Sequence, residues 1–460
     1  MSAVTPNNPP CPAYRASEKG SFAWDTTARR WPVILTGVID DMCKAYANET
    51  DETKVKEGKA IVEGISALKY EIGHDRPISW LTYALSLFRP LKEDGEADVA
   101  VWNQQIATYF PNSTWFDGSW LYNECLMYRR LRELYNLSTT WKNYDPFLSQ
   151  KNATFKGAYG AVFELAQKFS KLLDTQTEEQ TQILFHELMQ VCLWGNAHDL
   201  SLLTNMSQED IRNLQTTGKE KIEEQEKNIV VNDIDKVWNH VKGLKDARVD
   251  FVLDNSGFEL FVDLVLADWL VQTKKAEKVV FHCKTIPWFV SDVIEDDFPI
   301  LLESCFNPEF FASCSPSESD VAALKALASR WQDYIKNGQW VVTSHQFWCS
   351  GLAYRHLREE APELFADLAN NSQLVFFKGD LNFRKLTYDC KWPVTTPFNT
   401  ALGEDLSQHF TSICSLRTNK ADVICGLAEG VQEKIEQRAT PLEWRCGGKY
   451  AVVEYSSGRP

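Results

Sequence analysis

The sequence predicts an α/β protein in which a three-layer, Rossmann-like sheet domain follows a mainly helical N-terminal domain. The chain has 460 residues, enough for two large domains or three smaller ones. After Lys245, short apolar runs alternate with helical stretches, a pattern typical of βαβ units in a parallel sheet covered on both faces. We expect strands near residues 249–253, 278–282, 340–343, 374–378, 422–425 and 450–454.

Helical spacing dominates the part of the chain before this region. Five apolar residues recur three or four positions apart and so share one face of a helix: Leu121, Cys125, Tyr128, Leu131 and Tyr135. Residues 219–241 indicate a highly charged helix that passes into an amphipathic one, and we interpret this segment as the join between the two halves. The predicted organisation is a flexible arm at 1–20, a mainly helical domain at 21–227 and a Rossmann-like α/β domain at 228–460.

Charge and composition exclude several classes of protein. Acidic residues outnumber basic ones 63 to 48, so the chain is a poor binder of nucleic acid. No stretch approaches the roughly 18 apolar residues of a membrane span, and the N-terminus lacks a signal-peptide pattern. The 12 cysteines are scattered without a CxxC motif, which favours reduced thiols. We therefore expect a cytoplasmic protein, with the nucleus as a second candidate compartment, and a monomer is favoured.

Polar residues follow two of the expected strands. Asp254 and Asn255 leave the first strand together, and Asp292 comes shortly after the second. Because carboxyl ends of adjacent parallel strands meet at one edge of a sheet, these oxygens suit magnesium, manganese or a similar divalent ion. Asp254 is equally suited to cap the following helix, so both explanations stay open. His282 is interpreted as a buried or supporting residue rather than a metal ligand.

The strand expected at 374–378 leads into a second polar segment. Gly379 permits a tight turn, after which backbone amides can face an anion. Asp380, Asn382 and Arg384 then offer a carboxylate, an amide and a guanidinium to a phosphorylated, polyhydroxylated ligand. An ordinary strand-to-helix turn with Arg384 on the surface is the alternative.

Two cations stand close together further along this acidic chain. Arg417 and Lys420 precede the run at 422–425. A cationic clamp opposite a metal is what phosphoryl transfer requires, because negative charge spreads over the phosphoryl oxygens in the transition state. A pair of solvated surface cations explains the same pattern equally well.

Taken together, these runs resemble the metal-dependent damage-control phosphatase family, in the branch with the fungal sugar-phosphate phosphatases and the animal acidic-residue methyltransferase proteins. The resemblance is carried by DNSGFELFVDLVLADWL at 254–270, the PWFVSD run ending at Asp292, GDLNFRKL at 379–386 and an RTxK signature at 417–420. It extends into the helical half through segments at 29–40, 120–130, 193–203 and 230–240, and so covers nearly the whole chain.

The resemblance implies hydrolysis of sugar monophosphates such as fructose 1-phosphate or fructose 6-phosphate, supported by manganese, cobalt, nickel or magnesium. It implies that Asp254, Asn255 and Asp292 are the catalytic residues and hold the metal. It also implies a set of substrate contacts: Asp254, Asn255, Asp380, Leu381, Asn382, Phe383, Arg384, Arg417 and Lys420. Phe383 departs from the family, which often has Tyr there, and the lost hydroxyl could alter one ligand contact.

An alternative function follows from the same resemblance. Some members are described as methylating protein glutamates with S-adenosylmethionine, and Glu259 and Asp292 would then line the cofactor site. The chain lacks a glycine-rich loop after its first strand, since Gly257 stands alone, which favours the phosphatase. A non-catalytic scaffold is disfavoured because all the metal and phosphate residues are present.

The mechanism expected from the sequence is attack on phosphorus by water that the metal activates, with Asp254 as ligand and base. Attack by the Asp254 carboxylate is the alternative. The DxDx(T/V) run of haloacid-dehalogenase phosphatases is absent, since position 256 is Ser, and this favours water. In the helical half, Glu124 and Arg129 are candidates for closing the cleft, although structural roles are favoured for both.

Overall fold

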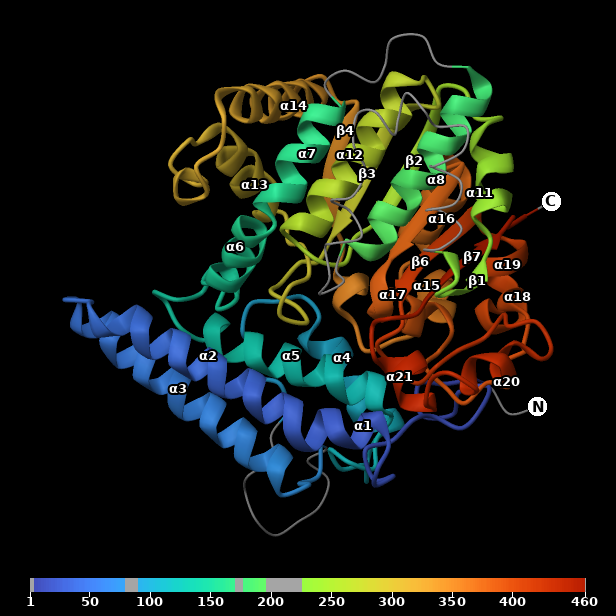
Figure 1. The fold of residues 1–460 in the computed structure, drawn as a ribbon. Helices are drawn as coiled ribbons and strands as arrows, with labels where there is room; N and C mark the ends of the chain where they lie inside the picture. The colour runs from blue at the N-terminus through green and yellow to red at the C-terminus, as the bar shows by residue number, and fades with distance from the viewer. Residues whose placement is uncertain (1–3, 79–89, 170–176, 196–225, 460) are drawn as a thin grey trace.

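The computed structural model describes residues 4–78, 90–169, 177–195 and 226–459. The centre of this described part is a seven-stranded sheet with the strand order β1-β7-β6-β5-β2-β3-β4 (Figure 1). The strands are β1 Ile229–Asn232, β2 Ala247–Val252, β3 Ala276–Cys283, β4 Trp340–Ser344, β5 Leu374–Lys378, β6 Ser412–Thr418 and β7 Ala451–Ser456.

Helices precede the sheet and connect its strands. The described helices before β1 are α1 Phe22–Asp25, α2 Trp31–Ala47, α3 Glu52–Gly73, α4 Val99–Tyr109, α5 Trp120–Asn136, α6 Leu148–Gly157, α7 Tyr159–Phe169 and α8 Glu178–Trp194. Those that follow are α11 Ile234–Val241, α12 Phe258–Gln272, α13 Asp297–Phe306, α14 Glu318–Lys336, α15 Leu357–Glu360, α16 Pro362–Asn371, α17 Gly379–Leu386, α18 Phe398–Leu402, α19 Glu404–Gln408, α20 Val431–Glu436 and α21 Pro441–Cys446.

Apolar side chains bury both faces of the sheet. On one face, Val249 and Phe251 of β2 pack in a core with α7, α8, α12 and α14. On the other face, Val252 and Phe377 pack in a core with α5, α16 and α17. Strands without polar alternation are typical of this arrangement, and the predicted three-layer α/β class is confirmed.

The expectation of a strand at 422–425, the fifth of the six, is wrong. Residues 422–425 form no strand, and β6 lies earlier, at Ser412–Thr418. This strand is wholly buried although it contains two serines, a threonine and Arg417, so its hydropathy does not mark it as a strand. Val423 and Cys425 are buried in the coil that follows, which explains their apolar character.

The sheet is mixed and not parallel throughout. β7 runs antiparallel to β6, whereas β1 runs parallel to β7. The segment Ile229–Asn232, for which a helix was expected, forms β1, and the amphipathic helix begins only with α11. The charged residues at 219–225 lie outside the described part of the chain.

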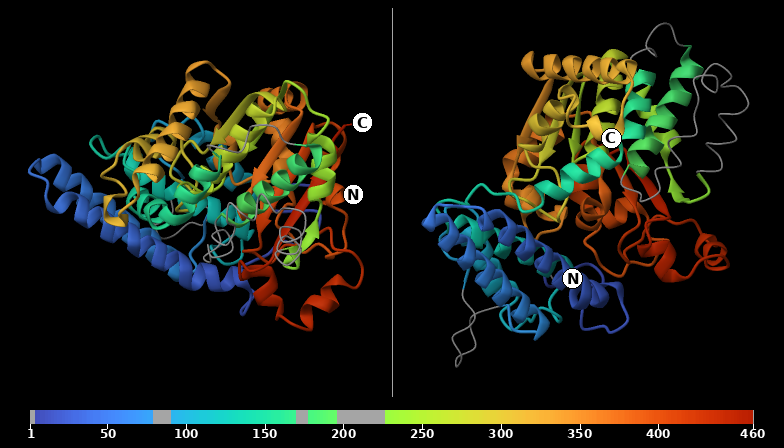
Figure 2. Two further views of the ribbon diagram at one scale, coloured as in Figure 1. Left: turned by 45° about the horizontal axis from the view of Figure 1, so that its top comes forward. Right: turned by 60° about the vertical axis from the view of Figure 1, so that its left-hand side comes forward.

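The first helices form a layer beside the sheet. α2 and α3 lie along each other, and α5 lies between this pair and the sheet loops (Figures 1 and 2). By contrast, α7 packs on α14, and α8 packs on α11 and α12, so both share a core with the sheet. The domain boundary at residue 227 stays a prediction.

Residues 4–20, for which we expected a flexible arm, contact two distant segments. The backbone N–H of Trp120 donates to the carbonyl of Tyr14 over 3.0 Å. Ala13 forms an isolated antiparallel bridge with Cys390. The segment therefore connects the start of α5 to the chain that follows α17.

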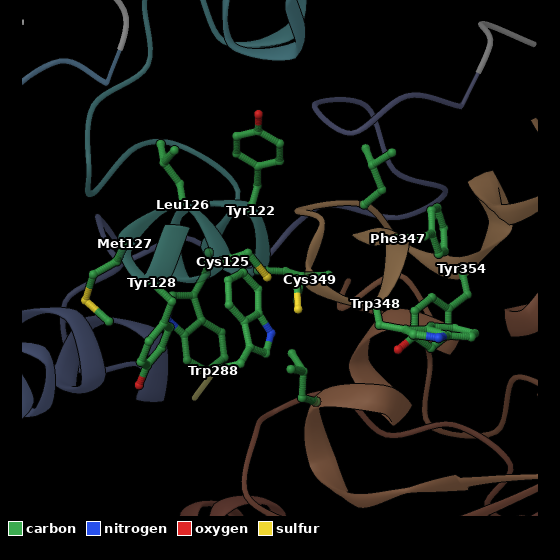
Figure 3. Close-up of a cluster of buried hydrophobic side chains, with 14 of the residues drawn as sticks. Tyr122, Cys125, Leu126, Met127, Tyr128, Trp288, Phe347, Trp348, Cys349 and Tyr354 are labelled. Atoms are coloured by element: carbon green, nitrogen blue, oxygen red, sulfur yellow. The ribbon is translucent and has the colours of Figure 1, made fainter. Parts of the chain in front are cut away.

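A cluster of buried aromatic and sulfur-containing side chains joins α5 to the loops of the sheet (Figure 3). The ring of Tyr128 lies 5.9 Å from that of Trp288, and the rings of Trp348 and Tyr354 lie 5.3 Å apart. Buried aromatic contacts of this kind stabilise beyond their area alone. The cluster thus holds α5 against the loop that carries Asp292.

Two sequence-based expectations concern the whole chain. All twelve cysteines are free, and eight of them are buried, in agreement with reduced thiols. Within the described ranges, none of the helices has the length and apolar character needed to cross a membrane.

Glu454 is a buried acid in β7 whose titration should affect stability. The Sγ atom of Cys425 lies 3.6 Å from its Oε2 atom, and burial raises the pKa of Glu454 from 4.5 to about 8. The folded protein keeps a proton that the unfolded chain releases, so the free energy of unfolding should fall between about pH 5 and pH 8. Glu454→Gln stays neutral and should be more stable than the parent by on the order of a few kcal/mol at about pH 8.5. Urea unfolding of both proteins at about pH 5 and pH 8.5 tests this, and a constant difference between them would contradict it.

Candidate active site at the carboxyl ends of β2, β3 and β5

Asp254 and Asn255 follow the end of β2, and both side chains are at least nine-tenths buried. The turn into α12 uses Gly257, whose φ of +73° favours glycine and where a Cβ atom would lie 3.4 Å from the carbonyl oxygen of Lys151. Gly257 occupies the N-cap position of α12, which has no side-chain cap. Helix capping therefore does not account for Asp254.

The loop after β3 brings Asp292 to the same place. Asn255 and Asp292 form an isolated antiparallel bridge, and the N–H of Val293 donates to the carbonyl of Asp254 over 2.8 Å. Phe289 and Val290 have positive φ values of 44° and 71°, a strained conformation for non-glycine residues. The ring of Tyr128 in α5 stacks on that of Phe289 at 4.7 Å, so the helical layer supports the strained loop.

Three buried carboxyl groups and a lysine determine the electrostatics of this site. Burial and the charges of Asp292 and Glu259 raise the pKa of Asp254 well above its usual value. Burial raises the pKa of Asp292 to about 6, although the Nζ atom of Lys284 lies 3.1 Å from its Oδ2 atom. Negative charge is thus concentrated and under-compensated here, and a cation would stabilise the ionised forms.

The beginning of α17 fits closely against Asp254. Gly379 has a φ of +82°, and a Cβ atom there would lie 1.9 Å from the Oδ2 atom of Asp254. No residue with a side chain could occupy this position without displacing the carboxylate. The carboxylate therefore lies at the N-terminal end of a helix, where the helix dipole favours negative charge.

Asp380 organises the RTxK segment beside Asp254. Its Oδ1 atom accepts hydrogen bonds from Nε of Arg417 over 2.7 Å and from the backbone N–H of Lys420 over 3.0 Å. The guanidinium of Arg417 is fully buried and also donates to the carbonyls of Val423 and Ala421. Lys420 is half-buried, and its charge lowers the pKa of Asp254. Because Asp380 follows Gly379, which packs against the Asp254 carboxylate, the backbone of Lys420 lies beside the candidate site.

The other predicted substrate residues of α17 lie inside the protein. Asn382 is fully buried and donates to the carbonyls of Val252, Leu253 and Lys378, so it ties the end of β2 to the end of β5. Leu381 and Phe383 belong to the apolar core. The Phe383 ring lies 4.3 Å from the Cζ atom of Arg417, in a cation–π contact.

Arg384 is also buried, contrary to the surface alternative considered from the sequence. It pairs with Glu124 of α5 over 2.7 Å and with Asp389 over 3.0 Å, and it lies 4.0 Å from the Trp120 ring. Arg129, the other candidate in α5, is fully buried and pairs with Asp94 and Asp98. Structural roles for both candidates in α5 agree with these contacts.

Comparisons with known proteins bear on this site. The sequence model of the damage-control phosphatase ARMT1-like domain matches residues 26–435. The chain belongs to this family. Proteins named damage-control phosphatase ARMT1 from Xenopus tropicalis, Danio rerio and Homo sapiens are each 34% identical to it. The alignments cover 98%, 97% and 95% of this chain and 99%, 97% and 96% of those proteins.

A solved structure of a DUF89 family protein from Pyrococcus horikoshii is also similar. It is 12% identical, with a TM-score of 0.41, and the alignment covers 90% of this chain and 93% of that one.

In this member of the damage-control phosphatase family, the described residues contain no group of three or more His, Cys, Asp or Glu side chains that could hold a metal ion. The predicted set instead combines two carboxylates, Asp254 and Asp292, with the amide of Asn255. Burial raises the pKa of both carboxyl groups, and the charge of Asp292 raises that of Asp254 further, so these buried oxygens fit a hard divalent cation. His282 is bonded to Asp250 over 2.8 Å, in agreement with a buried supporting role.

The sequence analysis did not identify two buried lysines near the candidate metal site. Lys284 follows β3 and donates to the carbonyl of Leu253 over 2.7 Å, besides its ion pair with Asp292. Lys378 is the last residue of β5 and is 1% exposed. A lysine at the end of an otherwise apolar strand is the signal that could have identified Lys378, because such a charge is buried only with partners.

Proposed function

We propose that the chain is a metal-dependent phosphatase that hydrolyses small phosphorylated metabolites, with sugar phosphates such as fructose 1-phosphate and fructose 6-phosphate as the substrate class. The observation that carries this proposal is the convergence of Asp254, Asn255 and Asp292 on one buried site, next to the RTxK segment that Asp380 holds. An acidic chain needs a local cation to hold an anionic substrate.

Each residue has a part in the proposed reaction. Asp254, Asn255 and Asp292 would hold the divalent cation, which supplies Lewis-acid polarisation of phosphorus and activates water when bound. The Lys420 ammonium neutralises phosphoryl oxygens, and Asp380 fixes the backbone of Lys420. Arg417 acts through Asp380, because its guanidinium is engaged with that carboxylate and with backbone carbonyls.

The methyltransferase alternative assigns Glu259 to a cofactor. In the structure Glu259 is 5% exposed, and its Oε2 atom accepts a hydrogen bond from Asn255 over 2.8 Å. These contacts favour a role beside the metal ligands and so support the phosphatase. Thermal shift with S-adenosylmethionine, against manganese with sugar phosphate, discriminates the two functions.

Phosphate release tests the proposed function directly. The purified full-length protein is incubated with a panel of sugar phosphates, first after treatment with a chelator and then with Mn²⁺, Co²⁺, Ni²⁺ or Mg²⁺ restored. We expect release only with metal, and strongest with small sugar monophosphates. Equal release in the presence of the chelator, or none with any substrate and metal, would contradict the proposal.

Replacement of Lys420 by alanine should lower kcat/KM for sugar phosphates by about 10- to 100-fold, because a charge-assisted contact to the phosphoryl group is lost. Lys420→Arg should retain part of the activity. The matched control is Lys449→Ala, a nearby exposed lysine whose loss should leave the kinetics unchanged. Steady-state kinetics on one sugar phosphate measures all three, and wild-type values for Lys420→Ala would remove this residue from the site.

A further inference from the structure

Lys378 connects three elements beneath the metal site. Its Nζ atom donates to the carbonyl of Cys192 in α8 over 2.6 Å and pairs with Oδ1 of Asp263 in α12 over 2.9 Å. The same atom lies 3.5 Å from Oε1 of Glu259, also in α12. Although burial opposes the charged form, Asp263 and Glu259 raise the pKa of Lys378, so it remains a cation.

Glu259 uses its two oxygen atoms in different directions. Oε1 faces Lys378, whereas Oε2 accepts a hydrogen bond from Nδ2 of Asn255 over 2.8 Å. Nδ2 of Asn255 also donates to Oδ2 of Asp254 over 2.5 Å. The Oδ1 atom of Asn255, on the other side of the amide, accepts a hydrogen bond from Ser291 over 2.5 Å. A continuous chain of contacts thus runs from β5 through α12 to the amide of Asn255.

We propose that Lys378 is a positioning residue that holds Glu259 so that Asn255 presents its amide oxygen, and not its amide nitrogen, to the divalent cation. This inference rests on the proposed function, because it assumes the cation. An ionised carboxylate only accepts hydrogen bonds, so the anchored Glu259, together with Asp254, selects the amide orientation with Nδ2 toward the two carboxylates and Oδ1 away from them. The nitrogen has no lone pair for a metal, and supporting residues of this kind typically change metal affinity by about 10- to 100-fold.

A double-mutant cycle on Mn²⁺ affinity tests this role without measuring turnover. Glu259→Gln should weaken Mn²⁺ binding about tenfold or more, because a glutamine no longer selects one amide orientation. Lys378→Met should weaken Mn²⁺ binding similarly. The double variant Lys378→Met/Glu259→Gln should bind Mn²⁺ as Glu259→Gln does, because both changes break the same chain of contacts. Asp263→Asn is the matched control, which leaves Lys378 on Glu259 and should keep the wild-type affinity within about twofold.

Isothermal titration with Mn²⁺ on the full chain gives the affinities, and circular dichroism checks folding. If Lys378→Met fails to fold, the variant Lys378→Met/Asp263→Leu takes its place in the cycle, because it removes both members of the buried ion pair. Three results would each overturn the positioning role. The losses of Mn²⁺ affinity in Lys378→Met and Glu259→Gln could add up in the double variant, or Lys378→Met could bind Mn²⁺ as the wild type does. Alternatively, Asp263→Asn could lose as much affinity as Lys378→Met. Failure of the wild-type protein to bind Mn²⁺ would instead overturn the proposed function together with this inference.

Discussion

Asp254→Asn is expected to reduce metal-dependent phosphate release by about a thousandfold or more. The carboxylate lies between Asn255, Asp292 and the first residue of α17, where a cation would be held. Loss of one charged ligand removes several kcal/mol of transition-state stabilisation, and each 1.36 kcal/mol is about a factor of ten in rate. Initial rates at saturating Mn²⁺ measure the effect.

The same substitution should stabilise the metal-free protein. Since the pKa of Asp254 is raised, its ionised form is disfavoured in the folded state at neutral pH, and a neutral asparagine avoids this cost. The melting temperature without metal should therefore rise while activity is lost. The control is Asp268→Asn in α12, the helix that follows Asp254. Asp268 pairs with Arg330, so this change should affect stability but not the rate of the folded enzyme. Activity retained by Asp254→Asn, or a lower melting temperature without metal, would contradict this account.

Arg384→Met is expected to lower the free energy of unfolding by about 3–5 kcal/mol, because Glu124 and Asp389 would remain buried without their cation. The Arg384–Glu124 pair also joins α17 to α5, so the layer of first helices should loosen. Urea unfolding followed by tryptophan fluorescence measures the change.

A matched surface pair provides the control for Arg384. Arg358 pairs with Asp405, but both side chains are largely exposed, at 53% and 39%. Arg358→Met should therefore change stability by less than about 1 kcal/mol. If Arg384→Met is as stable as the wild type and only raises KM, Arg384 contacts substrate and is not a structural residue.

The sequence was sufficient to predict the positions of the strands that consist of apolar residues. Residues 249–253 and 374–378 fall within or beside β2 and β5 because both faces of these strands are buried. The same rule failed for β6, whose buried serines and Arg417 find partners from distant segments. The antiparallel direction of β7 depends on how the chain returns after α21, which local patterns do not encode.

The candidate site likewise contains residues whose positions the sequence predicted and residues whose positions it did not. Asp254, Asn255 and Asp292 could be predicted to meet, because strand ends in one sheet share an edge. The sequence did not show that Asn382 and Arg384 point into the protein, since their partners come from β2 and α5. Lys378 was missed because its partners, Asp263 and Cys192, lie more than a hundred residues away.

The position of a bound cation tests the central claim most directly. Crystals of the full chain grown with Mn²⁺ and measured at the manganese absorption edge would show its anomalous signal. We expect one peak about 2.0–2.4 Å from oxygen atoms of Asp254, Asn255 and Asp292, with the Lys420 ammonium across the site. A peak elsewhere, or none at these residues while the protein is active, would contradict the account.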